Sequence, residues 1–175
     1  MADRIGNKKN NKLKGTNDDD KIIGKKGNDT LIGKDGNDLL EGGKGKDKLK
    51  DGAGEDTVFG GKGKDKLIAG EGSDDMYGGG GKDGFFYKGG ALGDDRIWDF
   101  QAGKDKLYIS EDYGFDNVQH VINNVANDGD DYRVDLSMDK DGFAKGKEGY
   151  QVALIDYQRN NKFDLDDLAG DIILY

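Results

Sequence analysis

The chain has 175 residues, of which 31 are glycine, 36% are charged and only 33% are hydrophobic, and its formal net charge is −9. This composition excludes an ordinary apolar core as the only source of stability, because chains with so little hydrophobic surface stay disordered unless something else stabilises them. The absence of cysteine excludes disulfides and thiolate metal sites, and no run approaches the ~18 apolar residues of a membrane-spanning helix.

The first half of the chain repeats itself every nine residues, from Gly6 to Phe86. Clear copies are GGKGKDKLK at 42–50 and GGKGKDKLI at 60–68. Position six is asparagine in the first copy and aspartate in the other eight: Asn11, Asp20, Asp29, Asp38, Asp47, Asp56, Asp65, Asp74 and Asp83. Position eight is apolar in all nine: Leu13, Ile22, Leu31, Leu40, Leu49, Val58, Leu67, Met76 and Phe85. Units this short bury apolar surface only by stacking, so the pattern predicts a solenoid.

Within each repeat we expect a turn at positions one to six and a short strand at positions seven to nine. Glycine at positions one, two and four permits positive φ, and period-two alternation directs position eight inward. Two repeats then form one coil, and like turns stack every eighteen residues, about 4.8 Å apart. The position-six residues fall into two columns, one with Asn11, Asp29, Asp47, Asp65 and Asp83, the other with Asp20, Asp38, Asp56 and Asp74.

Carboxylates stacked this closely repel one another unless a cation lies between them. Carboxylate and carbonyl oxygens are hard ligands, and a flexible cage of six to eight of them favours Ca²⁺ over Mg²⁺ or zinc. The alternative is a solenoid of Gly-Asp turns that holds no metal. We favour calcium, because unneutralised columns of aspartate would oppose their own stacking.

The repeat resembles the RTX nonapeptide family, whose pattern is GGxGxDxUx, and the resemblance covers residues 15–86 well and 6–14 weakly. It implies a parallel β-roll that binds several calcium ions through the position-six aspartates and the carbonyls of the turn glycines. Those glycines are Gly27, Gly36, Gly43, Gly45, Gly52, Gly54, Gly61, Gly63, Gly70, Gly72, Gly79 and Gly81.

The copies at the edge of the array depart from this pattern. Asn7, Lys9 and Asn11 replace its residues in the first copy, and Thr16 and Asp18 replace glycines in the second. Asp51 and Ala69 are milder changes at position one. We therefore expect weak or no calcium binding at the first turns, full sites between about residues 24 and 83, and about four to seven ions.

The array is expected to span 6–86, with its best repeats at 24–86, and a C-terminal capping region with a secretion signal to span 87–175. Residues 93–107, GDDRIWDFQAGKDKL, resemble a stretch that follows many RTX arrays. In this stretch we expect four apolar residues to close the open end of the roll: Ile97, Phe100, Leu107 and Ile109. Asp95 and Asp105 are either ligands of a further calcium ion or plain turn residues.

The elements after residue 110 are predicted from shorter sequence patterns. Apolar residues at helical spacing predict a short helix over 116–126, and alternation predicts strands near 132–136 and 152–155. Residues 156–167 have the spacing of an EF-type calcium loop, although an ordinary acidic turn is the favoured interpretation. The end of the chain, 171–175, is either an edge strand or, by resemblance to RTX proteins, part of an uncleaved export signal.

We therefore expect a calcium-binding module that folds on Ca²⁺ after export by type I secretion machinery, and a secreted, extracellular location. The irregular first repeat favours a C-terminal piece of a larger protein.

The alternative function is a module that binds an anionic polysaccharide such as alginate through rows of lysines. The other interpretation of these lysines is that they only offset the charge of the aspartates. They are Lys44, Lys46, Lys48, Lys62, Lys64 and Lys66. No nucleic-acid partner and no stable membrane insertion are expected. No HExxH, GxSxG or phosphate-binding motif is present, so we expect no enzyme.

Overall fold

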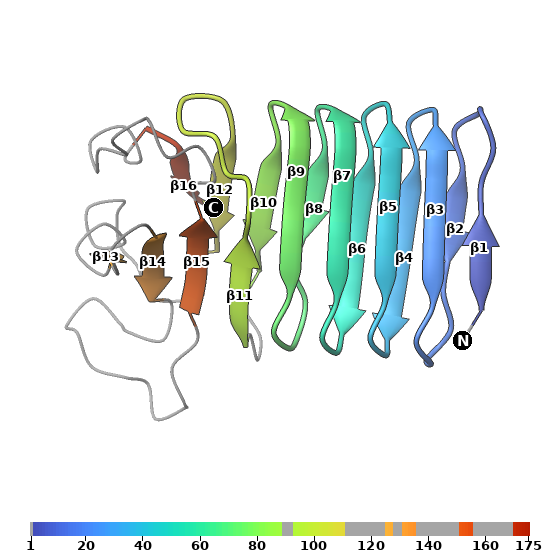
Figure 1. Cartoon of the computed structure of the whole chain (residues 1–175), viewed down its shortest axis with the longest axis horizontal. Coiled ribbons are helices and arrows are strands. Elements are labelled where there is room, and N and C mark those ends of the chain that lie inside the picture. The colour runs from blue at the N-terminus through green and yellow to red at the C-terminus, as the bar shows by residue number, and fades with distance from the viewer. Residues whose placement is uncertain (1, 89–92, 111–124, 128–130, 136–150, 156–169) are drawn as a thin grey trace.

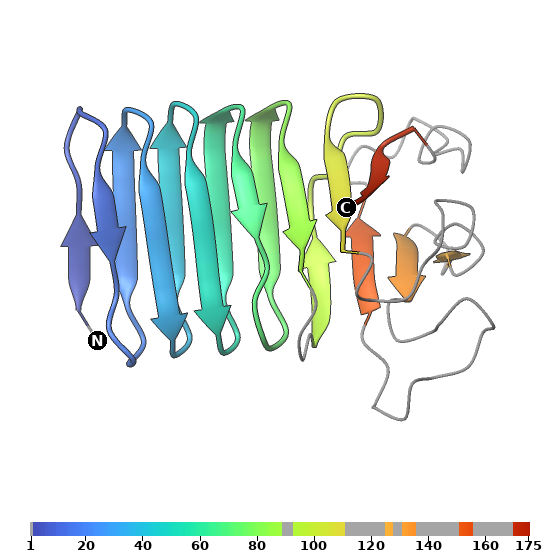
Figure 2. The same cartoon turned by 180° about the vertical axis from the view of Figure 1, so that it is seen from behind.

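The computed structural model describes residues 2–88, 93–110, 125–127, 131–135, 151–155 and 170–175. In these residues the chain is all-β and forms a solenoid of two facing sheets, with the N-terminus at one end of the stack (Figures 1 and 2). The strands pair in parallel except at the other end of the larger sheet, where residues 125–127, 131–135 and 151–155 pair antiparallel. The predicted parallel β-roll is confirmed. The helix expected over 116–126 and the EF-type loop over 156–167 lie outside the described residues.

Each sheet takes alternate strands of the repeat array. The nine-stranded sheet has the order β1 (Asp3–Ile5), β3 (Lys21–Lys26), β5 (Leu39–Lys44), β7 (Thr57–Gly63), β9 (Asp75–Gly81), β11 (Asp94–Ile97), β15 (Gln151–Ile155), β14 (Asp131–Asp135) and β13 (Val125–Asn127). The seven-stranded sheet has the order β16 (Ile172–Leu174), β12 (Lys106–Ile109), β10 (Gly84–Tyr87), β8 (Lys66–Ile68), β6 (Lys48–Ala53), β4 (Thr30–Asp35) and β2 (Lys12–Lys14). Strands were predicted near both β14 and β15, and β16 is the expected edge strand.

Strands of the array pair in parallel with a fixed offset of eighteen residues. Leu31 lies opposite Leu49, for example, and Leu40 lies opposite Val58. This register brings the position-eight side chains together between the two sheets, where all but Leu13 are buried: Ile22, Leu31, Leu40, Leu49, Val58, Leu67, Met76 and Phe85. The predicted coil of two repeats is therefore confirmed.

Position nine faces outward and carries part of the apolar surface that its mixed composition predicted. On the nine-stranded sheet, Phe59 stacks on Tyr77 with ring centroids 4.6 Å apart, and Tyr77 stacks on Trp98 at 6.2 Å. On the other sheet, Phe86 stacks on Tyr108 at 4.0 Å. Equivalent positions are one strand spacing apart, so aromatic side chains in register stack on one another and support the coil stacking.

The strands are longer than the repeat pattern suggested. β4, for example, runs through the first three positions of the following repeat, because main-chain pairing between equivalent turns continues there. Position-one glycines such as Gly24 and Gly42 accordingly lack positive φ, contrary to our expectation, whereas all position-four glycines and most residues at position two have it. The left-handed backbone is confined to the tip of the turn.

The roll continues for another coil after the nine-residue period ends. β11 pairs with β9 so that Arg96 lies opposite Asp75, and β12 pairs with β10 so that Lys106 lies opposite Gly84. These offsets of 21 and 22 residues replace the eighteen of the array. Inserted residues lengthen the coil without changing which side chains point inward. The apolar residues expected to close the roll are indeed buried in its core: Ile97, Phe100, Leu107 and Ile109.

Candidate metal centre

The position-six aspartates form two hydrogen-bonded columns, as predicted. In each column the main-chain N–H of one residue donates to Oδ1 of the aspartate one coil further along. Column one joins Asn11, Asp29, Asp47, Asp65, Asp83 and finally Asp105, with N–O distances of 2.7–2.9 Å. Column two joins Asp20, Asp38, Asp56, Asp74 and finally Asp95, with distances of 2.7–3.0 Å. Asp95 and Asp105 therefore extend the columns into the additional coil.

The second oxygen of these carboxylates is buried without a partner. Among the described residues, Oδ2 accepts no hydrogen bond in Asp29, Asp38, Asp47, Asp51, Asp56, Asp65, Asp74, Asp83 and Asp95. A buried carboxylate oxygen without a partner costs free energy, and native folds leave very few such atoms. A whole set of them along two columns indicates that a ligand outside the chain satisfies them.

The turn glycines lie close to these oxygens, at positions where a Cβ atom would not fit. A Cβ built on Gly42 would lie 2.6 Å from the carbonyl oxygen of Gly60 and 2.7 Å from Oδ2 of Asp47. At position four, a Cβ on Gly54 would collide with the carbonyl oxygen of Gly36, one coil back. Carboxylate oxygens and main-chain carbonyls thus converge around each turn, and side chains are excluded from the space between them.

The stacked carboxylates also oppose their own ionisation. Burial, with the neighbouring carboxylates of the column, raises the pKa of Asp56, Asp74 and Asp83 to about 7 and that of Asp95 to about 8. Burial is the largest cause and also raises the pKa of Asp47 to about 6. A bound divalent cation would favour the ionised form of each group and offset the repulsion.

Chemically the site fits calcium. Its donors are hard oxygen atoms only, from carboxylates and main-chain carbonyls, and the described part of the chain brings no imidazole to the columns. Such all-oxygen cages, built on flexible main-chain turns, suit Ca²⁺ better than Mg²⁺, which requires a smaller and stricter octahedron.

The first turns of the array differ from the rest. Asp20 uses Oδ2 within the chain, because the main-chain N–H and the hydroxyl of Thr16 both donate to it. In the first copy, the side-chain oxygen of Asn11 accepts from the main-chain N–H of Asn7. These two turns therefore lack the orphaned carboxylate oxygen of the later turns. Weak calcium binding here stays a prediction.

Two residues of the site, Asp51 and Asp99, were assigned no role in it from the sequence. Asp51 was interpreted as a mild change, yet it is buried and its oxygens lie with those of Asp56 and Asp74. Asp99 accepts hydrogen bonds from the main-chain N–H groups of Gly78 and Gly79, both 2.8 Å long. An aspartate at position one, where the other copies have glycine or alanine, was the available signal for Asp51.

Comparison with known families decides the nature of the array. The model of the RTX calcium-binding nonapeptide repeat matches four times, at residues 5–31, 14–49, 32–67 and 50–85. Residues 5–85 are an RTX array. The RTX repeat family binds calcium, and the buried rows of aspartate in this array are consistent with that ligand.

Two solved structures align with the chain, each with a limited overall likeness. The extracellular lipase LipA from Serratia marcescens aligns with a TM-score of 0.43 and 17% identity over 99% of this chain. The AlgE6R3 subunit of the Azotobacter vinelandii mannuronan C5-epimerase aligns with a TM-score of 0.35 and 25% identity, covering 96% of this chain and 80% of that one. The chain spans 40% of the length of the lipase. Among curated proteins, none matches the chain.

The RTX repeats themselves are non-catalytic modules, and the described residues outside them add no catalytic constellation. Within those same residues, no helix has the length and apolar character needed to cross a membrane.

Proposed function

We propose that this chain is a calcium-responsive folding module of a secreted protein. The observation that carries the proposal is the set of buried Oδ2 atoms in the two columns, which have no partner within the described chain. We assign the calcium ligands to the position-six aspartates from Asp29 to Asp83 and to the carbonyls of the turn glycines named above. Asp20 was also predicted as a ligand, but it is the weakest candidate, because its Oδ2 already accepts hydrogen bonds from Thr16.

Calcium supplies charge neutralisation and coordination between neighbouring turns. The chain supplies the rest: the Oδ1 hydrogen bonds fix each carboxylate, the glycines keep side chains out, and position eight adds one buried apolar residue per repeat. One such residue in nine is too little to offset the ordering of nine residues of backbone. Ion binding and folding therefore occur together.

This coupling suits export of an unfolded chain. Where free calcium is scarce the array stays unfolded and passes through type I machinery, and where calcium is millimolar it folds. We propose that residues 87–175 cap the array, since Ile97, Phe100, Leu107 and Ile172 are buried in the core that the repeats begin. We assign the export signal to the last residues, which include β16 at the edge of its sheet.

A calcium titration followed by far-UV circular dichroism tests the folding proposal. We expect the chelator-treated chain to lack strand signal, to gain it cooperatively with Ca²⁺, and to gain little with Mg²⁺ at the same concentration. The double variant Asp47→Asn with Asp65→Asn should raise the calcium midpoint. A full strand signal in chelator, unchanged by calcium, would refute the proposal.

A second candidate function is binding of an anionic polysaccharide such as alginate. The predicted lysine rows form in part, since Lys44 lies opposite Lys62 and Lys48 lies opposite Lys66. At the end of the second row, a groove of about 640 Å³ is lined by five lysines and two aromatic residues: Lys64, Lys66, Lys82, Lys104, Lys106, Phe86 and Tyr108. Lysines around aromatic rings match a polymer of anionic sugars.

Retention on an alginate column, with and without calcium, tests this candidate. The calcium-loaded wild type should be retained, and the variant Lys64→Gln with Lys82→Gln should elute earlier. Lys8→Gln with Lys9→Gln is the matched control, because it removes the same charge at exposed positions near the other end of the roll. Equal retention of both variants would argue against a site in the groove.

A further inference from the structure

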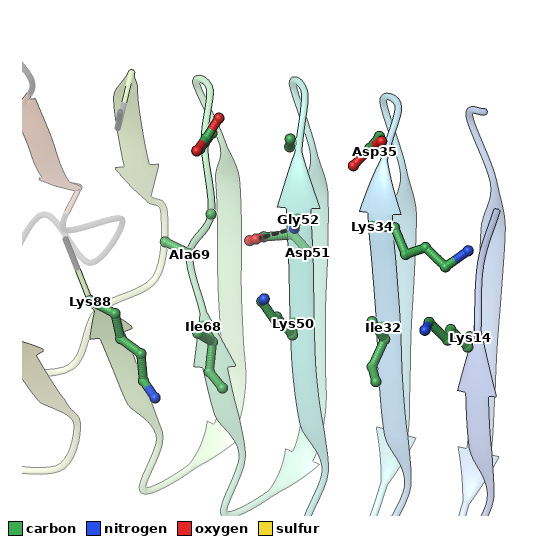
Figure 3. Close-up of a pocket in the computed structure, with 13 residues that line it drawn as sticks. Lys14, Ile32, Lys34, Asp35, Lys50, Asp51, Gly52, Ile68, Ala69 and Lys88 are labelled. Atoms are coloured by element: carbon green, nitrogen blue, oxygen red, sulfur yellow. Dashed lines mark hydrogen bonds between the residues drawn. The ribbon is translucent and has the colours of Figure 1, made fainter. Parts of the chain in front are cut away.

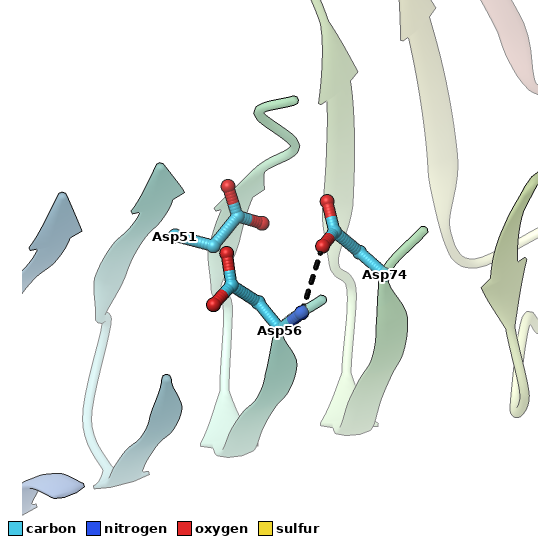
Figure 4. A group of neighbouring side chains, drawn as sticks. All are labelled: Asp51, Asp56 and Asp74. Atoms are coloured by element: carbon cyan, nitrogen blue, oxygen red, sulfur yellow. Dashed lines mark hydrogen bonds between the residues drawn. The ribbon is translucent and has the colours of Figure 1, made fainter. Parts of the chain in front are cut away.

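One turn of the array contains a third carboxylate. Asp51 occupies position one of its repeat, and one oxygen from each of Asp51, Asp56 and Asp74 lies within 4.8 Å of the others (Figure 4). All three residues are buried, Asp51 with only 1% of its surface exposed. They come from two adjacent coils, Asp51 and Asp56 from one and Asp74 from the next.

The third carboxylate is not satisfied within the chain. Oδ1 of Asp51 accepts from the main-chain N–H of Gly52 at 2.6 Å, and its Oδ2 has no partner. Oδ2 of Asp56 and of Asp74 is also orphaned. Three ionised carboxylates that share one buried space, with no cation from the described part of the chain among them, favour an external positive charge.

The backbone around this cluster also differs from that of the other turns. From the third repeat on, position two has positive φ at Lys25, Lys34, Gly43, Gly52, Gly61 and Gly79, whereas Gly70, one coil after Gly52, does not. Regular pairing of β6 with β8 stops at Ile68 and resumes as a single bridge between Ala53 and Glu71. The backbone has thus adjusted beside an aspartate at a position where seven of the nine repeats have glycine.

The turn of Asp51 lines a groove on the outside of the roll. This groove of about 620 Å³ crosses the outer face of the seven-stranded sheet, and its lining includes Asp51, Gly52, Ala69 and Gly70 beside the side chain of Lys50 (Figure 3). The carboxylate oxygens themselves are buried, so the turn must open on this side for an ion to reach them from the groove.

We propose that Asp51, Asp56 and Asp74 together bind one divalent cation, calcium, more tightly than any other turn of the array does. The inference rests on calcium binding by the repeats and adds a ligand that the repeat pattern does not contain. Affinity of oxygen cages for calcium rises with the number of charged ligands, and the other turns contribute position-six carboxylates without a third one. This turn is consequently the first to load and the point from which ordering spreads to neighbouring coils.

Calorimetric calcium titration of the full chain tests the inference, with the variant Asp51→Asn. In the wild type we expect one ion to bind about 10-fold or more tightly than the others. In Asp51→Asn that tight step should weaken by a similar factor, while the folded strand signal at saturating calcium is kept. Asp3→Asn, which removes the same charge from an exposed position on the first strand, β1, away from this groove, should leave it unchanged.

The possible outcomes separate this inference from the proposed function. If the wild type neither binds calcium nor folds with it, the proposed function fails as well. If several ions bind and Asp51→Asn has no effect on any step, or tightens one, only the inference is overturned. Should Asp51→Asn fail to fold, Asp51→Gly restores the residue found at the equivalent Gly33 and must then lose the tight step while still folding.

Discussion

At the scale of single residues, each turn depends on the absence of side chains at its glycines as much as on the position-six carboxylate. Position one is glycine because the carboxylate of the same repeat and a carbonyl of the next coil occupy the place of a side chain. The glycines at position four, and all those at position two except Gly70, have a different reason, since their φ values are positive. Gly80, at position three, has neither constraint, because a Cβ there would meet nothing within 4 Å.

This difference predicts opposite behaviour for two glycine substitutions. Gly42→Ala places a methyl group 2.6 Å from the carbonyl oxygen of Gly60, so the turn must shift and we expect a loss of about 1–3 kcal/mol in the calcium-loaded state. Gly80→Ala should be neutral within about 0.5 kcal/mol. Urea unfolding in saturating calcium measures both values. Similar losses for the two variants would show that the crowding at position one is not real.

The raised carboxylate pKa values predict how the calcium-free chain responds to pH. The folded pKa of Asp56, Asp74 and Asp83 is about 7, against an ordinary value of 3.8, because burial and neighbouring carboxylates disfavour ionisation. Groups with raised folded pKa stabilise the fold below their unfolded pKa, and this stability is lost as the pH rises through about 7. In chelator, strand signal should therefore increase from pH 8 to pH 5.

In calcium the trend is reversed, since protons and calcium compete for the same carboxylates. The calcium midpoint should rise as the pH falls from 8 to 5, and circular dichroism titrations at the two pH values measure it. A calcium-free chain that loses strand signal on acidification would contradict the assignment of these carboxylates to the interior.

The sequence predicted the columns of position-six aspartates correctly but not the role of Asp51. Each position-six aspartate was identified from its period alone, because the period fixes which side chains share a column. The role of Asp51 was not predicted, since its effect depends on the carboxylates of Asp56 and Asp74 in two neighbouring coils. Such convergence is a property of the stacked turn, and a motif read one repeat at a time does not contain it.

At the scale of elements, the strands owe their stability to position eight. Leu49 in β6 is fully buried between the sheets, whereas its neighbour Lys50 is exposed on the outer face. Equivalent leucines lie one coil away on either side, at Leu31 and Leu67, so Leu49 packs between two side chains of its own kind. Each leucine therefore contributes packing to two neighbours.

Leu49→Ala should lower the free energy of unfolding in calcium by about 2–5 kcal/mol, because it leaves a cavity in a row that cannot collapse. Lys50→Ala is the matched control, from the same strand, and should change stability by less than about 0.5 kcal/mol. Chemical unfolding at one calcium concentration compares them. Equal stability of the two variants would mean that the interior is not packed as described.

Element boundaries were predicted less well than element identity. Strands such as β5 extend past position nine because main-chain pairing depends on the neighbouring coil, whose turn continues in register. The additional coil formed by β11 and β12 was predicted only as apolar closure, since its offsets of 21 and 22 residues break the period while keeping the inward face. A fixed sequence period identifies coils of equal length, and it does not identify a coil that contains inserted residues.

For the whole molecule, the proposed function makes the roll depend on charge and on calcium. Residues 1–90 carry 18 basic against 17 acidic side chains, a net of +1, and residues 91–175 carry 9 against 19, a net of −10. Each bound calcium adds two positive charges, so the loaded roll becomes cationic. The unloaded roll keeps two buried acidic columns without counter-ions, and the apolar core of one residue per repeat does not compensate for them.

Hydrogen–deuterium exchange of the main-chain amides tests this coupling most directly, because it reports on individual strands. In saturating calcium, amides of β3 to β10 should be strongly protected, with the most buried middle coils slowest. In chelator the same amides should exchange at the rate of an unfolded chain. Protection of these strands in chelator, at a level similar to that in calcium, would contradict the account.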